Sequence, residues 1–549
     1  MTQHLRRYGP RVPTIQSESA RADQVENSAG GFGFAVDDWT ALKRFLILGT
    51  EGGTYYVGEH ETTKDNAESV ARCIEADGIR TVDTIVEISH SGRAPKNDYA
   101  LFAYAMCLAT ANVETRKYAG RPENFNRIVR IGTHLLHLAG YLEQFRGWGR
   151  IPRAVFSQWF GSKSADELAL QAVKYYSRDS WSLRDVLRLA HPNPHMNYAD
   201  GNLTAIAGVL EWIAAQREPP QVQDEWSPEL PTVIRGFHAI QGAVNDTHAA
   251  RIINDYGLPR EAVPTERLNS VEVWQALLPH MPMTALVRSL AKMTAVGVLA
   301  EHNRENVFNV MQRLTSEEAL RGARVHPIAM LSALKVYSQG HGERGKLSWH
   351  PVRAIVDALD AGFYASFGVV QPTNKNIVIG LDVSGSMDGT PLVGVPGLDA
   401  RVGAVAMAMV TANTEPSSRV SVMAFSREPV PVTFSPRQRL DDIVRETQNI
   451  PFGGTDCALP MLWAEAQGLH DVEAFIVYTD SETWAGQIHP FQALNNYRRR
   501  YVKDAKLIVV GMASNGFTIA DPTDAGMLDV VGFDTATPEI ISAFVRGEV

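Results

Sequence analysis

The sequence predicts a mainly α-helical protein that ends in one α/β domain with a Rossmann-like, doubly wound sheet. The chain has 549 residues, more than a single hydrophobic core organises, so two or more domains are expected. From Asp37 to about Ala365, apolar residues recur almost everywhere at helical spacing. Beyond that point, short runs rich in β-branched residues alternate with helical patterns, as in a parallel sheet. We divide the chain into a polar tail or strap (1–30), a helical domain (31–365) and an α/β domain (366–549).

The composition indicates a globular protein of a reducing compartment. Hydrophobic residues make up 45% and charged residues 21% of the chain, the balance of a folded, water-soluble protein. Cys73, Cys107 and Cys457 are too few and too scattered for a disulfide framework or a zinc cluster. We see no apolar leader and no run of about 18 apolar residues, so we expect a cytoplasmic protein with no membrane contact.

The helical domain is expected to consist of many short helices, interrupted by Pro and Gly. The expected helices are 38–48, 64–77, 79–91, 97–112, 123–143, 151–160, 164–178, 182–191, 202–216, 228–243, 270–278, 284–299, 304–315 and 326–338. Short helices in such number favour stacked helix pairs, as in an α-solenoid, although no repeat of fixed length is visible.

The α/β domain is expected to alternate strands with helices. Strand patterns lie at 376–383, 418–425, 474–479, 505–513 and 528–533, and helical patterns lie at about 400–414, 457–468 and 489–502. This order of elements predicts a parallel sheet with helices on both faces.

Hydroxyl and carboxylate residues follow the strands of this domain. The apolar run 377–381 ends at Asp382, and Ser384 and Ser386 complete a D-x-S-x-S sequence. A glycine loop before a helix offers Thr455, and strand 474–479 ends on Asp480. Because ligands of an open α/β sheet bind at the carboxyl ends of its strands, we expect these side chains at one edge. Their hard oxygen atoms suit Mg²⁺ or Mn²⁺ rather than zinc.

At these residues the domain resembles a von Willebrand factor A domain, whose metal-ion-dependent adhesion site uses D-x-S-x-S, then a Thr, then an Asp. The resemblance implies that all five residues form the shell of a divalent metal ion, Mg²⁺ or Mn²⁺. Few carboxylates and several neutral hydroxyls leave such an ion incompletely neutralised, so it can take an acidic group from a partner. The loops implicate no Cys, Lys or His as nucleophile or base, so binding is favoured over catalysis. The alternative is a serine-rich turn beside unrelated strand ends.

The net charge of −9 hides a basic stretch. Between Arg116 and Arg188 we count 13 Lys and Arg against 6 Asp and Glu, a local charge of +7, which leaves −16 for the remainder. A basic surface on an acidic body is the pattern expected of a nucleic-acid-binding protein. An ordinary solvated surface gives the same count, so the alternative stays open.

Two expected helices inside this stretch present cations. Capping boxes at 164–167 and 182–185 open them. Lys174 and Arg178 are four residues apart and are expected on one face of the first helix. The second helix is expected to bury 183, 186, 187 and 190 and to present Arg184, Arg188 and His191 on another face. Such cations can grip a phosphate backbone. Nearby aromatic residues, namely Tyr175, Tyr176 and Trp181, either stack on bases or pack in the core.

The stretch 174–192 resembles the Ro ribonucleoprotein family. Three further stretches do the same, namely Gly92–Asp98, Leu258–Glu266 and Met281–Leu286. Their order, followed by a von Willebrand factor A domain, matches the architecture of that family over nearly the whole chain.

The resemblance implies a HEAT-like helical ring, the TROVE module, at residues 31–365, closed by the von Willebrand factor A domain at 366–549. It implies that the outer surface binds small Y-like stem-loop RNA, through Lys174, Arg178 and His191 by position in the motif. It also implies that the ring accepts single-stranded 3′ ends of misfolded non-coding RNAs. Bacterial members are similarly linked to exoribonucleases such as polynucleotide phosphorylase. Such a protein is expected to be a monomer and to act in RNA quality control, with no DNA or membrane partner.

Two other functional classes are less favoured. The stretch 340–347 matches G-x-x-x-x-G-K, but Leu347 replaces the Ser or Thr and a predicted helix precedes it, so nucleotide hydrolysis is not expected. His134 and His137 share a predicted helix without a third ligand nearby, so helix packing is favoured over metal binding. We expect no enzyme activity. The main rival hypothesis is a helical scaffold whose metal site captures an acidic protein partner, without any RNA.

Overall fold

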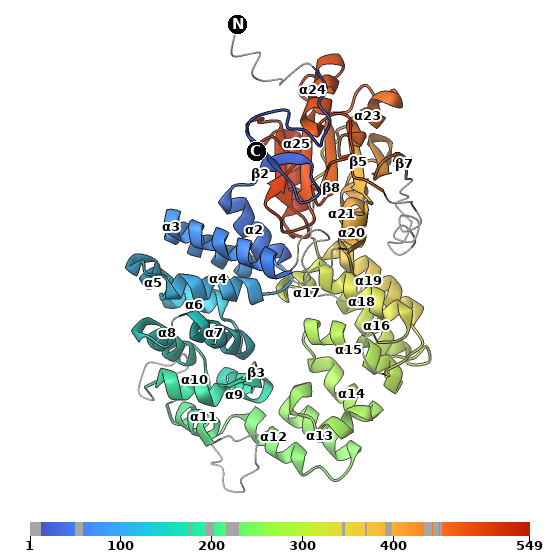
Figure 1. Ribbon diagram of the computed structural model, residues 1–549. Coiled ribbons are helices and arrows are strands. Elements are labelled where there is room, and N and C mark those ends of the chain that lie inside the picture. Colours follow the sequence, from blue (N-terminus) through green and yellow to red (C-terminus); the bar gives the residue numbers. More distant parts are fainter. Residues whose placement is uncertain are drawn as a thin grey trace.

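The helical domain bends into a ring, and the α/β domain closes it (Figure 1). The computed structural model describes residues 12–49, 59–145, 147–175, 177–178, 180–193, 203–215, 230–342, 346–367, 370–389, 398–432, 442, 450 and 453–548. Figure 1 shows two helical arms that leave the α/β domain and meet at the opposite end of the molecule. In the part of the chain that is described, no helix is long and apolar enough to cross a membrane.

The first arm contains ten helices among its described residues. They are α2 (Asp38–Leu48), α3 (Glu59–Ser91), α4 (Asp98–Ala109), α5 (Val113–Ala119), α6 (Pro122–Ile128), α7 (Gly132–Phe145), α8 (Arg150–Gly161), α9 (Ala165–Lys174), α10 (Leu183–Ala190) and α11 (Leu203–Ala215). Neighbouring helices pack in pairs, such as α2 on α3 and α4 on α7, which confirms the predicted array of short helices.

The second arm returns to the α/β domain. Its helices are α12 (Thr232–Gln241), α13 (Asp246–Tyr256), α14 (Val271–Leu277), α15 (Met283–Val296), α16 (Arg304–Leu314), α17 (Glu317–Gly322), α18 (Pro327–Gln339) and α19 (Arg353–Ala365). Helix α13 was not predicted, because polar residues fill its first turn. The Asn245 side chain caps it by accepting a hydrogen bond from the backbone N of His248, and the helix then buries Ala249, Ile252 and Ile253.

Two helical predictions are wrong in extent. The expected helix 123–143 is interrupted after Ile128. There the indole N–H of the buried Trp159 donates a hydrogen bond to the carbonyl oxygen of Val129 at 2.7 Å. The expected helix 164–178 ends at Lys174, because Tyr175 leaves helical backbone geometry with φ −130° and ψ 58°. The expected break between 77 and 79 is confirmed by a kink within α3 at Asp77.

The α/β domain is built on a six-stranded sheet in the order β11-β9-β8-β5-β6-β7. The strands are β5 (Ile377–Asp382), β6 (Val420–Phe425), β7 (Pro429–Pro431), β8 (Ala474–Thr479), β9 (Lys506–Gly511) and β11 (Met527–Val531). All pairs are parallel except the one between β6 and the edge strand β7. The five predicted strands and the doubly wound fold are thus confirmed.

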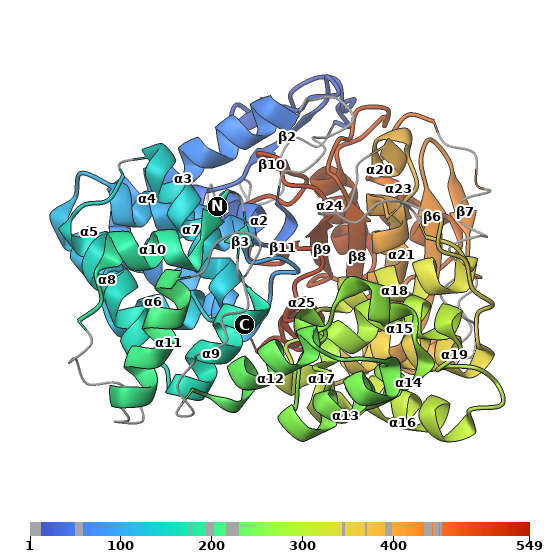
Figure 2. The same cartoon turned by 90° about the horizontal axis from the view of Figure 1, so that it is seen from below.

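Helices cover both faces of this sheet, as Figure 2 shows from below. They are α20 (Gly385–Gly389), α21 (Ala400–Thr414), α23 (Leu459–Ala466), α24 (Pro490–Arg500) and α25 (Thr537–Arg546). Alternate residues of β5 divide between two hydrophobic cores: Ile377 and Ile379 join the core that continues into the helical arms, and Val378 joins a separate core with α23 and α24. The first face therefore joins the domain to the ring.

The described part of the N-terminal segment belongs structurally to the α/β domain. Strands β1 (Gln24–Glu26) and β2 (Phe32–Ala35) pair with each other, and β2 also pairs with β10 (Phe517–Thr518). We call residues 12–35 the N-terminal strap. Its strands were not predicted, because they are too short to form without a partner almost 500 positions away in the chain.

The two arms also touch beside the α/β domain, at the loop 92–97 that joins α3 to α4. The Arg93 guanidinium donates to the Asp534 carboxylate of the α/β domain, with Nε at 2.9 Å from Oδ1. His326, at the start of α18, lies 3.0 Å through its Nε2 from the carbonyl oxygen of Arg93. These contacts join the first arm, the second arm and the α/β domain at one place, which we call the seam.

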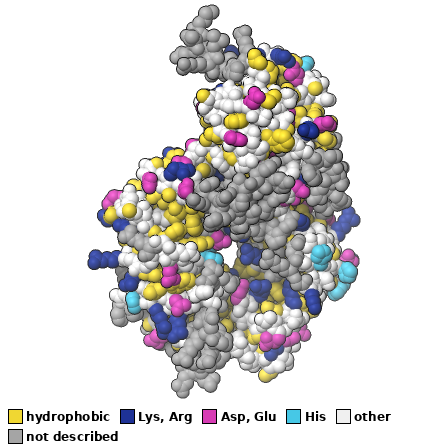
Figure 3. Space-filling model, viewed as in Figure 1, with side chains coloured by type: hydrophobic (Ala, Val, Ile, Leu, Met, Phe, Trp, Pro, Cys, Tyr) yellow, Lys and Arg dark blue, Asp and Glu magenta, His cyan; other side chains and the backbone are white. Residues whose placement is uncertain are grey.

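Figure 3 shows the molecular surface hollowed between the arms, with Lys and Arg side chains along one side of the hollow.

Candidate functional site

The D-x-S-x-S residues form a buried cluster at the carboxyl end of β5. The backbone N of Ser384 donates to Asp382 Oδ1 at 2.9 Å, and the hydroxyls of Ser384 and Ser386 lie 3.1 Å apart. All three side chains are at most 1% exposed. The turn of α20 begins directly after Ser384, so Ser386 lies in its first turn.

Asp480 follows the neighbouring strand β8 and joins the cluster. Its carboxylate is hydrogen-bonded to the Ser386 side chain. The hydroxyl of Thr479 donates to Asp382 Oδ2 at 2.6 Å and so ties the two strand ends together. Burial and the nearby Asp480 charge raise the pKa of Asp382 to about 7, and burial raises the pKa of Asp480 as well. Two buried carboxylates that have no ion-pair partner among the described residues favour the approach of a cation.

Thr455 supplies the fifth predicted residue from the loop before α23. Its carbonyl oxygen accepts hydrogen bonds from the backbone N of Trp484 at 3.0 Å and of Ala485 at 2.9 Å, so its loop packs on the loop after β8. Its side chain is 1% exposed, and its hydroxyl has no hydrogen-bond partner among the described residues. A buried hydroxyl left without a partner is costly, and a bound cation would satisfy it. The donor set of two carboxylates and three hydroxyls fits Mg²⁺ or Mn²⁺.

The N-terminal strap holds these two loops in place through Gln16. The side chain of Gln16 is fully buried, and its Nε2 donates to Asp456 Oδ1 at 2.7 Å and to the carbonyl oxygen of Ile488 at 2.8 Å. Its Oε1 accepts from the Thr483 hydroxyl and from the backbone N of Gly486. Asp456 adjoins Thr455, and Thr483 lies three residues after Asp480. Sequence reasoning missed Gln16, since no local pattern around it carries a functional signal.

A second connection runs from the ring to the same edge. Arg44 of α2 is fully buried and pairs with Asp529 at 2.9 Å, and its Nη1 also donates to Asn515 Oδ1 at 2.8 Å. The side-chain amide of Asn515 in turn donates to the backbone carbonyl of Asp480. The position of Asp480 therefore depends, through Asn515 and Arg44, on helix α2 of the ring.

The predicted basic residues lie around α9 and α10 in the first arm. Both capping boxes are confirmed, at Ser164 with Glu167 and at Ser182 with Asp185. Lys174 is the last residue of α9, and its Nζ lies 5.4 Å from the centroid of the Tyr175 ring.

The prediction that Lys174 and Arg178 share a helix face is wrong. The chain leaves α9 at Tyr175 and forms a hairpin of β3 (Ser177–Arg178) and β4 (Trp181–Ser182). Ser180, in the turn, adopts the left-handed conformation with φ 65°. The Arg178 side chain and the whole of Tyr176 lie outside the described residues.

Helix α10 presents the second set of cations as expected. Leu183, Val186, Leu187 and Ala190 are buried, which confirms the predicted apolar stripe. Arg188 and His191 are exposed, and Arg184 is half-buried. His191 ends the helix in the left-handed conformation with φ 47°. Trp181 is partly buried with its ring 5.7 Å from that of Trp148, so the core-packing reading holds for this side chain.

The fold and the two sites define a class of protein, a ring of helix pairs closed by a von Willebrand A-type domain. The Ro60 von Willebrand A (vWA) domain model matches residues 376–545, and the TROVE domain model matches residues 25–225 and 257–336. The chain is 41% identical to the RNA-binding protein RO60 of Deinococcus radiodurans over 97% of either chain. It is 35% identical to the RNA-binding protein RO60 of Caenorhabditis elegans over 98% of this chain and 92% of that one.

A solved structure agrees with these sequence relatives. The crystal structure of the Deinococcus radiodurans Ro (Rsr) protein matches with a TM-score of 0.68 at 40% identity, over 93% of this chain and all of that one. The chain therefore belongs to the Ro60 family of TROVE-domain proteins, as the sequence resemblance implied.

Proposed function

We propose that this protein binds RNA and acts in the quality control of non-coding RNA. The observation that carries the proposal is the match to RNA-binding RO60 proteins over almost the whole chain, together with the exposed Arg188 and His191 at α10 and the half-buried Lys174 that ends α9. Lys174, Arg188 and His191, with Tyr175, Arg178 and Arg184 beside them, contact the phosphates of a small Y-like stem-loop RNA. Contacts from Lys, Arg and His side chains to phosphates favour recognition of the RNA backbone and shape over its sequence.

The ring accepts the single-stranded 3′ end of a misfolded RNA. A closed ring admits a single strand more readily than a folded stem, so aberrant RNAs with free ends are selected without base-specific contacts. The protein itself performs no catalysis. It acts as a cytoplasmic monomer and passes the RNA to an exoribonuclease such as polynucleotide phosphorylase.

The edge of the α/β domain binds Mg²⁺ or Mn²⁺. Asp382, Ser384, Ser386, Thr455 and Asp480 hold the ion, and the incompletely neutralised ion accepts a carboxylate from a protein partner. The Thr455 hydroxyl, which has no hydrogen-bond partner among the described residues, and the neighbouring carboxylates of Asp382 and Asp480 support this assignment. An acidic segment of the partner nuclease is the natural ligand of such an ion.

Titration with a small stem-loop RNA at several salt concentrations tests the RNA proposal. Replacing both Lys174 and Arg188 with Ala removes two phosphate contacts, so affinity should fall about tenfold or more and the salt slope should drop by roughly 2. Arg321→Ala is the control, because Arg321 is exposed on α17, far along the chain from α9 and α10, and its ion pair among the described residues is with Glu317. Unchanged affinity of the double variant would refute the site.

A second candidate function, the scaffold without RNA, rests on the buried metal edge alone. A chelator should abolish capture of an acidic partner at that edge and leave RNA binding intact, whereas salt should weaken RNA binding steeply. If a chelator abolishes capture of the acidic partner and the protein has no affinity for RNA, the scaffold hypothesis is correct.

A further inference from the structure

An exposed tryptophan lies beside the candidate metal site. Trp484, in the loop after β8, is 37% exposed. Its ring packs on Gly454, where a Cβ atom would lie 3.0 Å from the ring carbon Cζ2. Gly454 directly precedes Thr455, one of the five predicted metal ligands. The exposed indole therefore rests on the loop that carries a ligand of the candidate ion.

The backbone of Trp484 is held by two further contacts. Its N donates to the carbonyl oxygen of Thr455 at 3.0 Å. Gly31 of the N-terminal strap packs so closely on it that a Cβ atom at Gly31 would lie 2.9 Å from the Trp484 Cα. Because the backbone is held and the ring rests on glycine, the indole has its position before a partner arrives. Binding to it therefore costs little conformational entropy.

A cation borders the same loop. Arg427, between β6 and β7, is exposed, and its Cβ lies 3.5 Å from the position that a Cβ atom of Gly453 would occupy. A guanidinium meets a carboxylate through two parallel hydrogen bonds, so Arg427 is suited to an acidic side chain. We call Trp484, Arg427 and the glycine pair 453–454 that touches both of them the rim.

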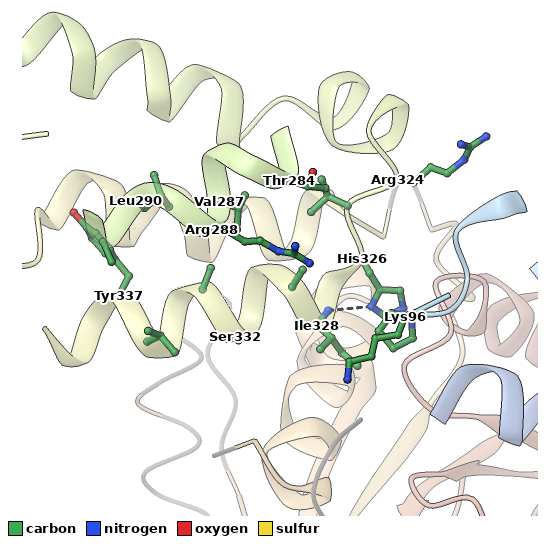
Figure 4. A pocket seen from close by; sticks show the side chains of 16 residues that line it. Lys96, Thr284, Val287, Arg288, Leu290, Arg324, His326, Ile328, Ser332 and Tyr337 are labelled. Atoms are coloured by element: carbon green, nitrogen blue, oxygen red, sulfur yellow. Dashed lines mark hydrogen bonds between the residues drawn. The ribbon is translucent and has the colours of Figure 1, made fainter. Parts of the chain in front are cut away.

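The rim is less basic than the groove inside the ring. Glu428 directly follows Arg427 and is also exposed. Lys96, Arg288 and Arg324 line the groove between α15 and α18 (Figure 4), and no Asp or Glu is among its described lining residues. A phosphate backbone is bound by several cations together, so RNA is expected in the ring rather than at the rim. The charge of the rim suits a protein segment with separate carboxylates.

We propose that the rim binds an extended acidic segment of a partner protein. One carboxylate of the segment lies at the candidate metal site, a large apolar side chain packs on Trp484, and a second carboxylate pairs with Arg427. The inference rests on the proposed metal function of this edge and adds to it the kind of partner that binds there.

The spacing within the segment follows from the rim. An extended chain advances about 3.3–3.6 Å per residue, and the ring of Trp484 rests on the neighbour of Thr455. We therefore expect the apolar residue within about two positions of the first carboxylate. A metal ion accepts any carboxylate, so the contact with the indole supplies the selectivity, as buried aromatic anchors do in other interfaces.

The first test selects peptides from a random heptapeptide library displayed on phage. The full chain is immobilised with Mn²⁺, and bound phage are eluted with a chelator. Selected peptides are expected to carry Asp or Glu with Phe, Tyr, Trp, Leu or Ile within two positions. The same selection on Trp484→Ala should keep the acidic residue and lose the apolar one. An apolar preference of equal strength in that variant would overturn the proposal.

The affinity of one selected peptide, labelled with fluorescein, measures the two side chains separately. Trp484→Ala should weaken binding at least about tenfold. Trp484→Phe should retain most of the affinity, because it keeps an aromatic ring on the glycine loop. Arg427→Ala should weaken binding about twofold to fivefold, since an exposed ion pair contributes less. Arg499→Ala is the matched control, because Arg499 is exposed on α24 and donates to Asn496.

The outcomes separate the rim from the proposed function. If the protein binds Mn²⁺ but selects no peptide, or only acidic peptides without an apolar residue, the rim is refuted and the metal function stands. If it binds neither Mn²⁺ nor acidic peptides, the metal function fails and the rim fails with it. Arg427 is exposed, so its variant keeps the test valid if Trp484→Ala does not fold. A uridine decamer that displaces the peptide, and binds Trp484→Ala more weakly, would assign the rim to RNA and contradict the proposal.

Discussion

The candidate metal edge of the α/β domain (Asp382, Ser384, Ser386, Thr455 and Asp480) and the basic surface of α9 and α10 are built in opposite ways. At this edge, five residues from three loops are buried, and their loops are connected to the N-terminal strap through Gln16 and to α2 through Asn515 and Arg44. On the basic surface, Arg188 and His191 project from one short helix into solvent. The first site is held by the whole domain, and the second needs only a stable helix beneath it.

This difference decides what a substitution does. A change at the edge or in its supports disturbs a buried hydrogen-bond network, so it lowers the free energy of unfolding as well as binding. A change among exposed cations alters the local electrostatic potential and leaves stability within about 0.5 kcal/mol. Four predictions, from the largest expected effect on stability to the smallest, test this contrast.

The largest effect is expected for Arg44→Met. The substitution removes a fully buried guanidinium and leaves Asp529 and Asn515 without their partner, so unfolding should become easier by about 3–5 kcal/mol. Denaturant titration measures the change. Arg72→Ala is the control, because Arg72 and its partner Asp38 are about half exposed and such pairs contribute less than about 1 kcal/mol. Equal losses in the two variants would contradict the described network.

A smaller loss is expected for Gln16→Ala. It leaves the buried Asp456 and Thr483 side chains short of a hydrogen bond, which costs about 1–3 kcal/mol. Because the loops of Thr455 and Asp480 then lose their common support, binding of Mn²⁺ should also weaken several-fold, measured by calorimetry on the full chain. Ser17→Ala, next to it and exposed, should change neither quantity. Normal metal affinity in Gln16→Ala would show that the strap does not position the site.

The stabilising effect of Mg²⁺ should depend on pH. The pKa of Asp382 is raised from its ordinary 3.8 to about 7, so the folded metal-free protein favours the protonated group and loses stability as pH rises through that interval. Mg²⁺ binds the deprotonated form, so it should raise the melting temperature more at pH 8 than at pH 5.5. Thermal unfolding with Mg²⁺ or with chelator at both pH values measures this. An equal shift at both values, or no shift, would count against the metal assignment.

The smallest effect on stability is expected for the double replacement of Lys174 and Arg188 with Ala. Arg188 is exposed and Lys174 is half-buried at the end of α9, so the melting temperature should stay within about 2 °C, although RNA affinity falls. Thermal unfolding alongside RNA titration separates the two quantities. A large fall in melting temperature would show that these cations support the fold rather than a ligand.

The sequence predicted the arrangement of the five edge residues better than that of the basic residues, for a physical reason. The five edge residues follow strands whose apolar runs are unambiguous, and a parallel sheet brings strand ends to one edge. Arg178, in contrast, was placed on a helix because the spacing from Lys174 allowed it. The chain instead turns at Tyr175 into a hairpin. Helical periodicity describes spacing along one element, so it cannot reveal the pairing between β3 and β4.

Other features depended on residues distant in sequence. Gln16 supports loops 440 to 470 positions away, and Phe34 pairs with Thr518, so neither could be recognised from neighbouring residues. The seam likewise depends on Arg93, His326 and Asp534 meeting in space. Such long-range contacts close the ring, while local patterns gave the helices and strands that compose it.

Crosslinking of the protein in its own cells, followed by sequencing of the attached RNA and of the crosslinked peptide, tests the central claim most directly. We predict one abundant small stem-loop RNA attached to the stretch from Lys174 to His191. Recovery of no RNA above background would contradict RNA binding and would favour the metal-dependent scaffold.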